Sequence, residues 1–283
     1  CMNYVSYSRD IEDYKVVMLD SYGVVKNHKG LIDGVQESIR TLKQKGKTFR
    51  LLTNDASRSQ EQQLESLQRL GLHDIELHEI ITSGMMARQF LEQKITSGRI
   101  AYLGTQNSAE YILQSGLQHV AAGDVDLNDI DDIAAFVFLD DEGFDWNTDI
   151  NKTVNLLRKK TMPVILANSD KYYPVAKHDI AVATGGIAKL VESMLGKKFI
   201  HFGKPDSQMF MYAYESLVQE IGPLEKNDIL MVGDTLETDI LGGNRFGVGT
   251  MLVLSGNSRA EHVEREISAT GIIPDYICED ILS

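Results

Sequence analysis

The sequence predicts an α/β protein in which a doubly wound parallel sheet carries a smaller α/β domain as an insertion. Two observations lead to this class. Short apolar runs that end in polar residues alternate with helix-like segments, as in sheets whose strands all end at one edge. About 150 residues then separate Thr53 from Gly203-Lys204-Pro205, far more than such a sheet needs there, so we expect an inserted domain.

Composition and charge narrow the class of protein. The chain has 283 residues, of which 43% are apolar, enough for two cores. Its formal net charge of -13 argues against binding to nucleic acid, because no dense run of basic residues can replace the counterions of a phosphate backbone. No apolar run has membrane-spanning length, and Cys1 and Cys278 show no metal-ligand spacing. We therefore expect a cytoplasmic protein with no membrane partner, and a homo-oligomer stays possible.

The first predicted strand delivers a carboxylate to the edge of the sheet. Residues 16–19 are Val, Val, Met and Leu, and this apolar run stops at Asp20 and turns at Gly23. A strand that ends in a turn Asp followed by Gly also occurs without any catalytic role. This stretch alone therefore leaves a structural and a catalytic interpretation open.

The next units continue the alternation. Apolar residues at helical spacing from Val35 to Leu42 predict a helix that ends at Gly46. Residues 49–53 then form an apolar strand that reaches Thr53 and Asn54 at its polar end. The resulting β-α-β order is typical of a parallel sheet.

We place the inserted domain at residues 84–185, between the core segments 1–83 and 186–283. Thr82-Ser83-Gly84 and Thr184-Gly185-Gly186 are runs of small residues suited to hinges. Apolar runs inside the insertion predict three further strands, at residues 99–104, 134–139 and 163–168. Helix-like segments separate them, which predicts a second, smaller α/β layer.

The last third of the chain is expected to complete the first domain. An amphipathic helix at residues 187–195 would pack on that domain. Lys204 follows in a Gly-Lys-Pro sequence, and a strand at residues 228–232 runs into Gly233-Asp234, with Asp239 in the next helix. The first domain is therefore expected to be discontinuous.

Four polar segments stand at the ends of strands or the starts of helices: Asp20 with Gly23, Thr53 with Asn54, Lys204 with Pro205, and Gly233-Asp234 with Asp239. In this order they resemble the four motifs of the haloacid dehalogenase-like (HAD) hydrolases. The long insertion between the second and third segments is similar to the class II, type A cap of nitrophenylphosphatases and nucleotide phosphatases. The resemblance implies a Rossmann-like core with a cap domain.

The resemblance also implies a chemistry, that of a phosphatase acting on a small phosphorylated metabolite through an aspartyl-phosphate. Asp20 would be the nucleophile and a ligand of Mg²⁺. Asp234, Asp239 and the backbone carbonyl of Tyr22 would supply further oxygen atoms to the metal. Taken singly, Asp234 and Asp239 also fit a helix cap and a first-turn acid.

Donors for the phosphate would come from the second and third motifs. The Thr53 hydroxyl and the Asn54 amide would donate hydrogen bonds to phosphate oxygens, and Lys204 would offset negative charge in the transition state. Lys204 alone also fits a solvated loop lysine. The seven histidines show no ligand spacing and are expected to be structural or exposed.

Substrate contacts are expected near Gly23 and from the inserted domain. Asn168 and Asp170 occupy a stretch that resembles the Asn-Pro-Asp sequence of type A caps. Asp55 stands where relatives carry Asn and would repel an anion, which nearby Arg58 would offset. A solvated role for Arg58 is an equal alternative.

Tyr22 is the main departure from the phosphatase pattern. It occupies the position of the Asp that protonates the leaving group, and general acid–base help is worth ~10²–10⁴-fold in rate. An alternative function is therefore a phospho-ligand binding module with weak or no turnover. A lower alternative is a 2-haloacid dehalogenase, although those enzymes carry their cap between the first and second motifs.

Overall fold

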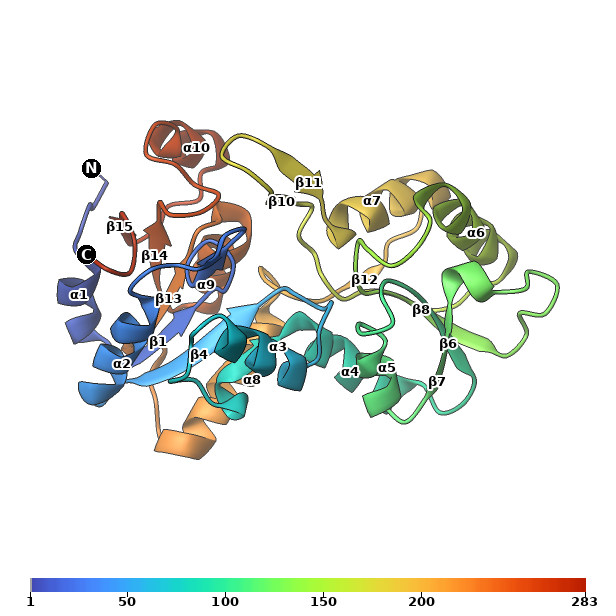
Figure 1. Cartoon of the computed structure of the whole chain (residues 1–283), viewed down its shortest axis with the longest axis horizontal. Coiled ribbons are helices and arrows are strands. Elements are labelled where there is room, and N and C mark those ends of the chain that lie inside the picture. The colour runs from blue at the N-terminus through green and yellow to red at the C-terminus, as the bar shows by residue number, and fades with distance from the viewer. Residues whose placement is uncertain (1) are drawn as a thin grey trace. The chain divides into compact units, whose positions relative to one another are not determined.

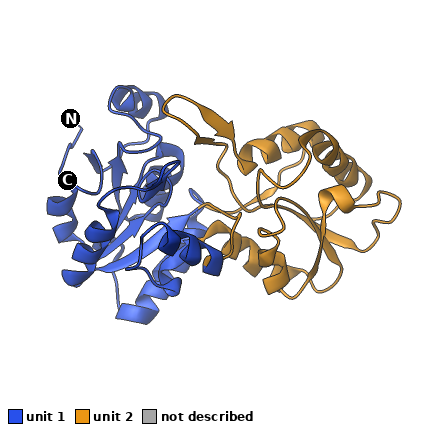
Figure 2. Ribbon diagram, viewed as in Figure 1, with its two compact units in different colours: residues 1–53, 61–81, 204–283 blue, residues 54–60, 82–203 orange. Residues whose placement is uncertain are grey.

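The computed structural model describes residues 2–283, and Cys1 lies outside the described residues (Figure 1). The chain forms two compact units (Figure 2). The first comprises the described residues up to Thr53 together with Glu61–Ile81 and Lys204–Ser283, and the second comprises Asn54–Gln60 and Thr82–Gly203. Each unit has its own sheet.

The first unit is built on a six-stranded sheet in the order β15-β14-β13-β1-β4-β5. Its strands are β1 (Val16–Leu19), β4 (Thr48–Thr53), β5 (Ile80–Thr82), β13 (Ile229–Gly233), β14 (Gly249–Val253) and β15 (Tyr276–Cys278). Pairing from β15 through to β4 is parallel throughout. A two-stranded ribbon of β2 (Lys26–Asn27) and β3 (Gly30–Leu31) lies outside this sheet.

Helices accompany this sheet along the chain. They are α1 (Tyr7–Asp10), α2 (Val35–Gln44), α3 (Gln60–Arg69), α8 (Ser207–Ile221), α9 (Leu241–Phe246) and α10 (Val263–Thr270), with a π-helical turn at Leu236–Ile240. The helix predicted from Val35 and Leu42 is confirmed as α2, and both residues are buried in one core with Leu19 and Leu51. Burying such a side chain stabilises the fold by about 1.5–3 kcal/mol. β1 is buried at all four positions, as the apolar run predicts for a central parallel strand.

The second unit has a five-stranded parallel sheet in the order β12-β9-β8-β6-β7. Its strands are β6 (Arg99–Leu103), β7 (Gln118–Ala121), β8 (Ile133–Phe138), β9 (Val164–Leu166) and β12 (Ile200–His201). A separate antiparallel pair consists of β10 (Tyr172–Pro174) and β11 (Ile180–Val182). The helices are α4 (Ser83–Lys94), α5 (Glu110–Gln114), α6 (Trp146–Lys159) and α7 (Thr184–Leu195).

The predicted class, an α/β protein with a Rossmann-like parallel sheet and a smaller α/β cap, is confirmed. The compact units differ from the predicted boundary at residues 185 and 186, because the second unit continues to Gly203. Ile187 and Val191 of α7 are buried in a core with Phe136 and Phe138 of β8, and β12 pairs with β9. An amphipathic pattern shows that a helix buries one face but does not identify the sheet that covers it.

The helices were compared with the length and hydropathy that a membrane-spanning helix needs. Over residues 2–283, no helix combines the length and the apolar character that crossing a bilayer requires.

Candidate active site

The register of the first sheet brings the ends of β1, β4 and β13 to one edge, and with them Asp20, Thr53 and Asp234. β1 pairs with β13 and β4 so that Leu19 lies opposite both Val232 and Leu51. Asp20 continues β1, and its backbone N–H donates to the Val232 carbonyl at 2.9 Å. The carboxyl ends of parallel strands are where open α/β sheets bind ligands.

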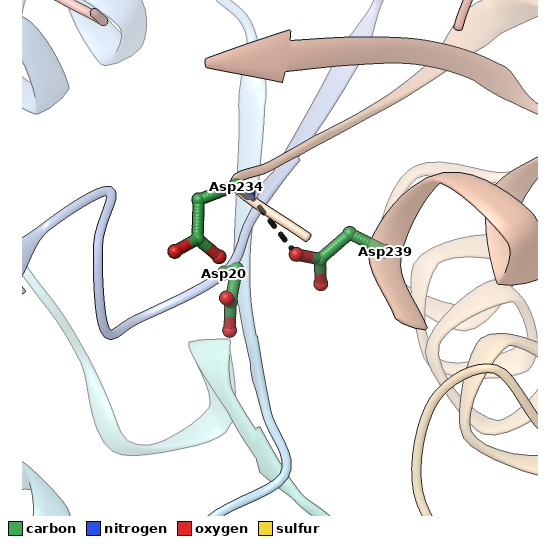
Figure 3. A group of neighbouring side chains, drawn as sticks. All are labelled: Asp20, Asp234 and Asp239. Carbon is green, nitrogen blue, oxygen red and sulfur yellow. Dashed lines mark hydrogen bonds between the residues drawn. The ribbon is translucent and has the colours of Figure 1, made fainter. Parts of the chain in front are cut away.

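Three carboxylates meet at this edge. Asp20, Asp234 and Asp239 each offer an oxygen atom, and these atoms lie within 4.8 Å of one another. Figure 3 shows Asp239 reaching back from the segment after β13 to the backbone N–H of Asp234. The sequence predicted all three as metal ligands, and the structure brings them together.

Lys204 neutralises part of this negative charge. Its Nζ donates to Asp20 Oδ1 at 2.8 Å, to Asp239 Oδ1 at 2.7 Å and to the Leu52 carbonyl at 2.8 Å. The lysine is 1% exposed. Burial on its own would lower the pKa of Lys204, but Asp20 and Asp239 outweigh burial and raise the pKa above its usual value. The ammonium group is therefore fixed and charged.

Asp239 fixes both the lysine and the turn before it. Its Oδ1 accepts from Lys204, and its Oδ2 accepts from the backbone N–H groups of Asp234 at 3.1 Å and Thr235 at 3.2 Å. A Cβ atom on Gly233 would lie 2.2 Å from the Asp239 side chain, so this close approach requires glycine. Asp239 thus acts first as a positioning group.

Asp234 is the carboxylate with the least favourable surroundings for a charge. It is 1% exposed, and its Oδ2 accepts from Asn257 N at 2.7 Å. Burial, and then the charges of Asp20 and Asp239, raise the pKa of Asp234 well above its usual value. Gly23 has φ +88, and a Cβ atom there would lie 2.1 Å from Asp234 Oδ2. This explains why glycine follows the first strand.

The donor set fits a divalent cation. Lys204 forms ion pairs with Asp20 and Asp239, and no ion pair involving Asp234 occurs among the described residues, so the formal negative charge of the three carboxylates exceeds the positive charge by two. Burial raises the pKa of Asp234, and the neighbouring charges of Asp20 and Asp239 raise it further. Mg²⁺ prefers hard oxygen ligands, and carboxylates are such ligands.

Two further predicted residues belong to the same unit. Tyr22 is half-buried beside the cluster, and burial followed by the Asp234 charge raises the pKa of its hydroxyl. The phenol therefore keeps its proton at neutral pH. Thr53 is the last residue of β4 and is buried.

The remaining predicted residues belong to the second unit. Asn54 Nδ2 donates to Asp170 Oδ1 at 3.0 Å, so the structure brings these two side chains together. Asn168 Oδ1 accepts from the Asp170 N–H at 2.9 Å and shapes the turn after β9. The Arg58 side chain is exposed. Their contacts with substrate stay predictions.

The sequence analysis missed the loop after β14. There Asn257 donates its N–H to Asp234, and Ser255 Oγ donates to the Gly23 carbonyl at 2.8 Å. The available signal was Ser255-Gly256-Asn257 directly after an apolar strand, the same arrangement that identified Asp20.

The comparisons with known proteins agree with this geometry. Residues 17–118 match a family model described as haloacid dehalogenase-like hydrolase, and residues 201–283 match one described as HAD-hydrolase-like. The chain is 48% identical to a structure described as a possible sugar phosphatase of the HAD superfamily from Cytophaga hutchinsonii, with a TM-score of 0.96 over 100% of this chain and 99% of that one.

Two more distant relatives extend the comparison. A 4-nitrophenylphosphatase structure from Thermotoga maritima is 25% identical, with a TM-score of 0.77 and 96% of each chain covered. Glycerol-3-phosphate phosphatase of Gallus gallus is 28% identical over 94% of this chain and 89% of its own length. With the four motifs in order and the acidic cluster at the strand ends, the chain belongs to the haloacid dehalogenase-like superfamily of hydrolases, in its cap-containing, nitrophenylphosphatase-like branch.

Proposed function

We propose that this enzyme is a Mg²⁺-dependent phosphatase of small phosphorylated metabolites, with Asp20 as its nucleophile. The orientation of the Asp20 carboxylate carries the proposal. Oδ1 accepts hydrogen bonds from Lys204 Nζ and from Ser21 N, each at 2.8 Å, and these are the bonds that this carboxylate accepts within residues 2–283. Oδ2 is thereby left to attack a phosphorus atom.

The reaction has two displacement steps. Asp20 Oδ2 forms a bond to phosphorus while the bond from phosphorus to the ester oxygen breaks, which gives an aspartyl-phosphate and an alkoxide that takes a proton from solvent to become the alcohol. Water then attacks the same phosphorus atom and releases Asp20 and inorganic phosphate. Lys204 stays beside Asp20 throughout, where its charge stabilises the added negative charge of the phosphoryl group.

The metal would be held by the carboxylates of Asp20 and Asp234, with the Tyr22 carbonyl as a further oxygen and Asp239 behind them. When bound, a divalent cation supplies the positive charge that lets an anionic phosphate approach three carboxylates. Thr53 is proposed to donate a hydrogen bond to the phosphoryl oxygens from the end of β4, and Asn54 is proposed to do so from the adjoining segment.

Proton transfer to the leaving group is where this chain departs from the phosphatase pattern that its motifs resemble. The raised pKa of Tyr22 keeps the phenol protonated, so it can donate a hydrogen bond but is a poor base. Activation of water in the second step should therefore be slow. This observation also favours a second candidate function, a phospho-ligand binding protein with slow turnover.

The substrate class is proposed from the relatives. Two of them carry names that specify glycerol 3-phosphate and 4-nitrophenyl phosphate as substrates, and the relative at 48% identity is described as a possible sugar phosphatase. All three are small phosphate monoesters. We assign Arg58, Asn168 and Asp170 of the second unit to contacts with the organic part of such a substrate, and Gly23 to close approach beside Asp20.

The test is hydrolysis of an aryl phosphate with and without Mg²⁺. Asp20→Asn keeps the side-chain shape and removes the nucleophile, so turnover should fall to background, whereas Asp33→Asn, at an exposed position in the same unit, should retain it. Mass spectrometry of quenched wild type should show phosphate attached to Asp20. Equal rates for wild type and Asp20→Asn would remove the mechanism. Metal-independent halide release from 2-haloacids would replace it with dehalogenation.

A further inference from the structure

The boundary between the two units falls within the second motif. Thr53 ends β4 and belongs to the first unit, whereas Asn54 begins the segment 54–60 and belongs to the second. A single peptide bond therefore separates two residues that the proposed function assigns to one phosphate. Something in the second unit must hold the segment 54–60 in place.

Tyr111 of α5 makes that connection. Its side chain is fully buried, and its hydroxyl donates to the Arg58 carbonyl at 2.5 Å. The same oxygen lies 2.6 Å from Thr82 Oγ1. A phenol has one hydrogen to donate, so Thr82 is the donor in the second bond.

These bonds form a directed chain. Met85 N donates to Thr82 Oγ1 at 3.2 Å, Thr82 donates to Tyr111, and Tyr111 donates to Arg58. Hydrogen bonds in such a series strengthen one another. The start of α4 is thereby tied to the middle of the segment 54–60.

The packing around the phenol ring is equally specific. A Cβ atom on Gly84 would lie 2.3 Å from the Tyr111 ring, so the first turn of α4 rests directly on the ring. At the start of the segment, Asn54 donates to Asp170, and a Cβ atom on Gly203 would lie 2.8 Å from Asn54 Oδ1. The stretches of chain that lead into and out of the second unit are thus held together.

We propose that Tyr111 is a positioning residue for substrate binding, which it performs by fixing the segment 54–60 and hence Asn54 and Arg58 to the second unit. The inference rests on the proposed function. Asn54 and Arg58 are then fixed to the second unit, whereas Thr53 and the nucleophile Asp20 belong to the first. Loss of the hydroxyl should weaken substrate binding and leave the chemistry at Asp20 nearly unchanged.

The kinetic test is a double-mutant cycle on the full chain with 4-nitrophenyl phosphate and Mg²⁺. Tyr111→Phe keeps the ring on Gly84 and should raise KM about tenfold with kcat within about twofold. Asn54→Ala should raise KM by itself, and the double variant should raise KM by less than the product of the two single effects, because Tyr111 acts in part through Asn54. Independent, additive effects, or an unchanged KM in Tyr111→Phe, would overturn the proposal.

Tyr102→Phe is the matched control. Tyr102 is another buried tyrosine of the second unit, in β6, and its ring packs edge-on against His119. Removing its hydroxyl should leave both KM and kcat at the wild-type values. A KM increase equal to that of Tyr111→Phe would show a general loss of packing and would overturn the specific role.

Hydrogen exchange separates this inference from the proposed function. In Tyr111→Phe the amides of residues 54–60 should exchange faster than in wild type, while those of β1 and β13 should keep wild-type rates. This measurement needs no turnover, so it decides the role of Tyr111 even if wild type hydrolyses no phosphate ester. If residues 54–60 of Tyr111→Phe exchanged at the wild-type rate, the inference would be overturned and the proposed function would stay intact.

Discussion

Both units have acidic residues at the ends of strands, but the groups that contact these carboxylates differ between the two units. In the first unit Asp20 and Asp234 follow β1 and β13, and the buried Lys204 forms ion pairs with Asp20 and Asp239. In the second unit Asp140 and Asp141 follow β8, and Asp55 adds a third negative charge.

No lysine or arginine within residues 2–283 forms an ion pair with Asp140 or Asp141. Hydroxyl groups take that place, since Thr105 Oγ1 donates to Asp140 at 3.2 Å and Tyr173 donates to Asp141 at 3.3 Å. Burial, followed by Asp141 and Asp55, raises the pKa of Asp140 to about 7. Lys204 therefore gives the first cluster a buried counter-charge, whereas the second cluster is held by hydroxyl donors.

Removal of Lys204 should give the largest effect. Lys204→Met leaves the buried Asp239 and the partly buried Asp20 without a counter-charge, and breaking a buried pair typically costs about 3–5 kcal/mol. We expect a loss of that size in urea denaturation, together with a fall in kcat of about 10²–10³-fold. Lys29→Met, at an exposed position of the same unit, should change neither quantity. Wild-type stability in Lys204→Met would contradict the assigned geometry.

Magnesium should distinguish the two clusters. A ligand that binds only the native state adds RT ln(1 + [L]/Kd) to stability, about 2.7 kcal/mol at one hundred times Kd, so Mg²⁺ should raise the Tm of wild type. Asp234→Asn should abolish most of this rise, whereas Asp140→Asn should retain it. A Tm rise that persists in Asp234→Asn and disappears in Asp140→Asn would place the cation in the second unit and contradict the proposed metal site.

The Asp140 carboxyl should make the second unit sensitive to pH. Because its pKa is raised from about 3.9 in the unfolded chain to about 7, the native state holds the proton more tightly. The resulting stabilisation is complete below pH ~4 and is lost as pH rises through ~7. The Tm difference between Asp140→Asn and wild type should therefore increase in favour of the variant between pH 5 and pH 8. Asp131→Asn, at an exposed site, should show no such trend.

The smallest expected effect is that of the Tyr173 hydroxyl. This hydrogen bond lowers the pKa of Asp141, although burial raises that pKa overall. Tyr173→Phe should therefore raise the pKa of Asp141 further, as measured by NMR titration of its carboxyl carbon. An unchanged or lowered pKa would show that the 3.3 Å contact makes no energetic contribution.

The sequence predicted which residues stand at strand ends better than it predicted their hydrogen-bond and ion-pair partners. Asp20 and Asp234 could be identified because each follows an apolar run directly. The three hydrogen-bond partners of Lys204 could not be identified from the sequence. Asp20, for example, is 184 positions away from Lys204, and only the folded sheet brings the two residues together. Helix α7 was assigned to the wrong unit for a related reason, since its pattern specifies an apolar face but not the core that covers it. The contact of Asn257 with Asp234 was missed because the Ser255-Gly256-Asn257 stretch carries no carboxylate, and only the folded sheet shows that this loop reaches Asp234.

The composition of the second unit has a consequence for engineering. It consists of two separate pieces of chain, Asn54–Gln60 and Thr82–Gly203. A cap exchanged between relatives as the longer piece alone would leave behind the Arg58 carbonyl that Tyr111 binds and the Asn54 amide that Asp170 accepts from. A chimera designed to change substrate preference must therefore transplant both pieces, with chain junctions after Thr53, Gln60, Ile81 and Gly203.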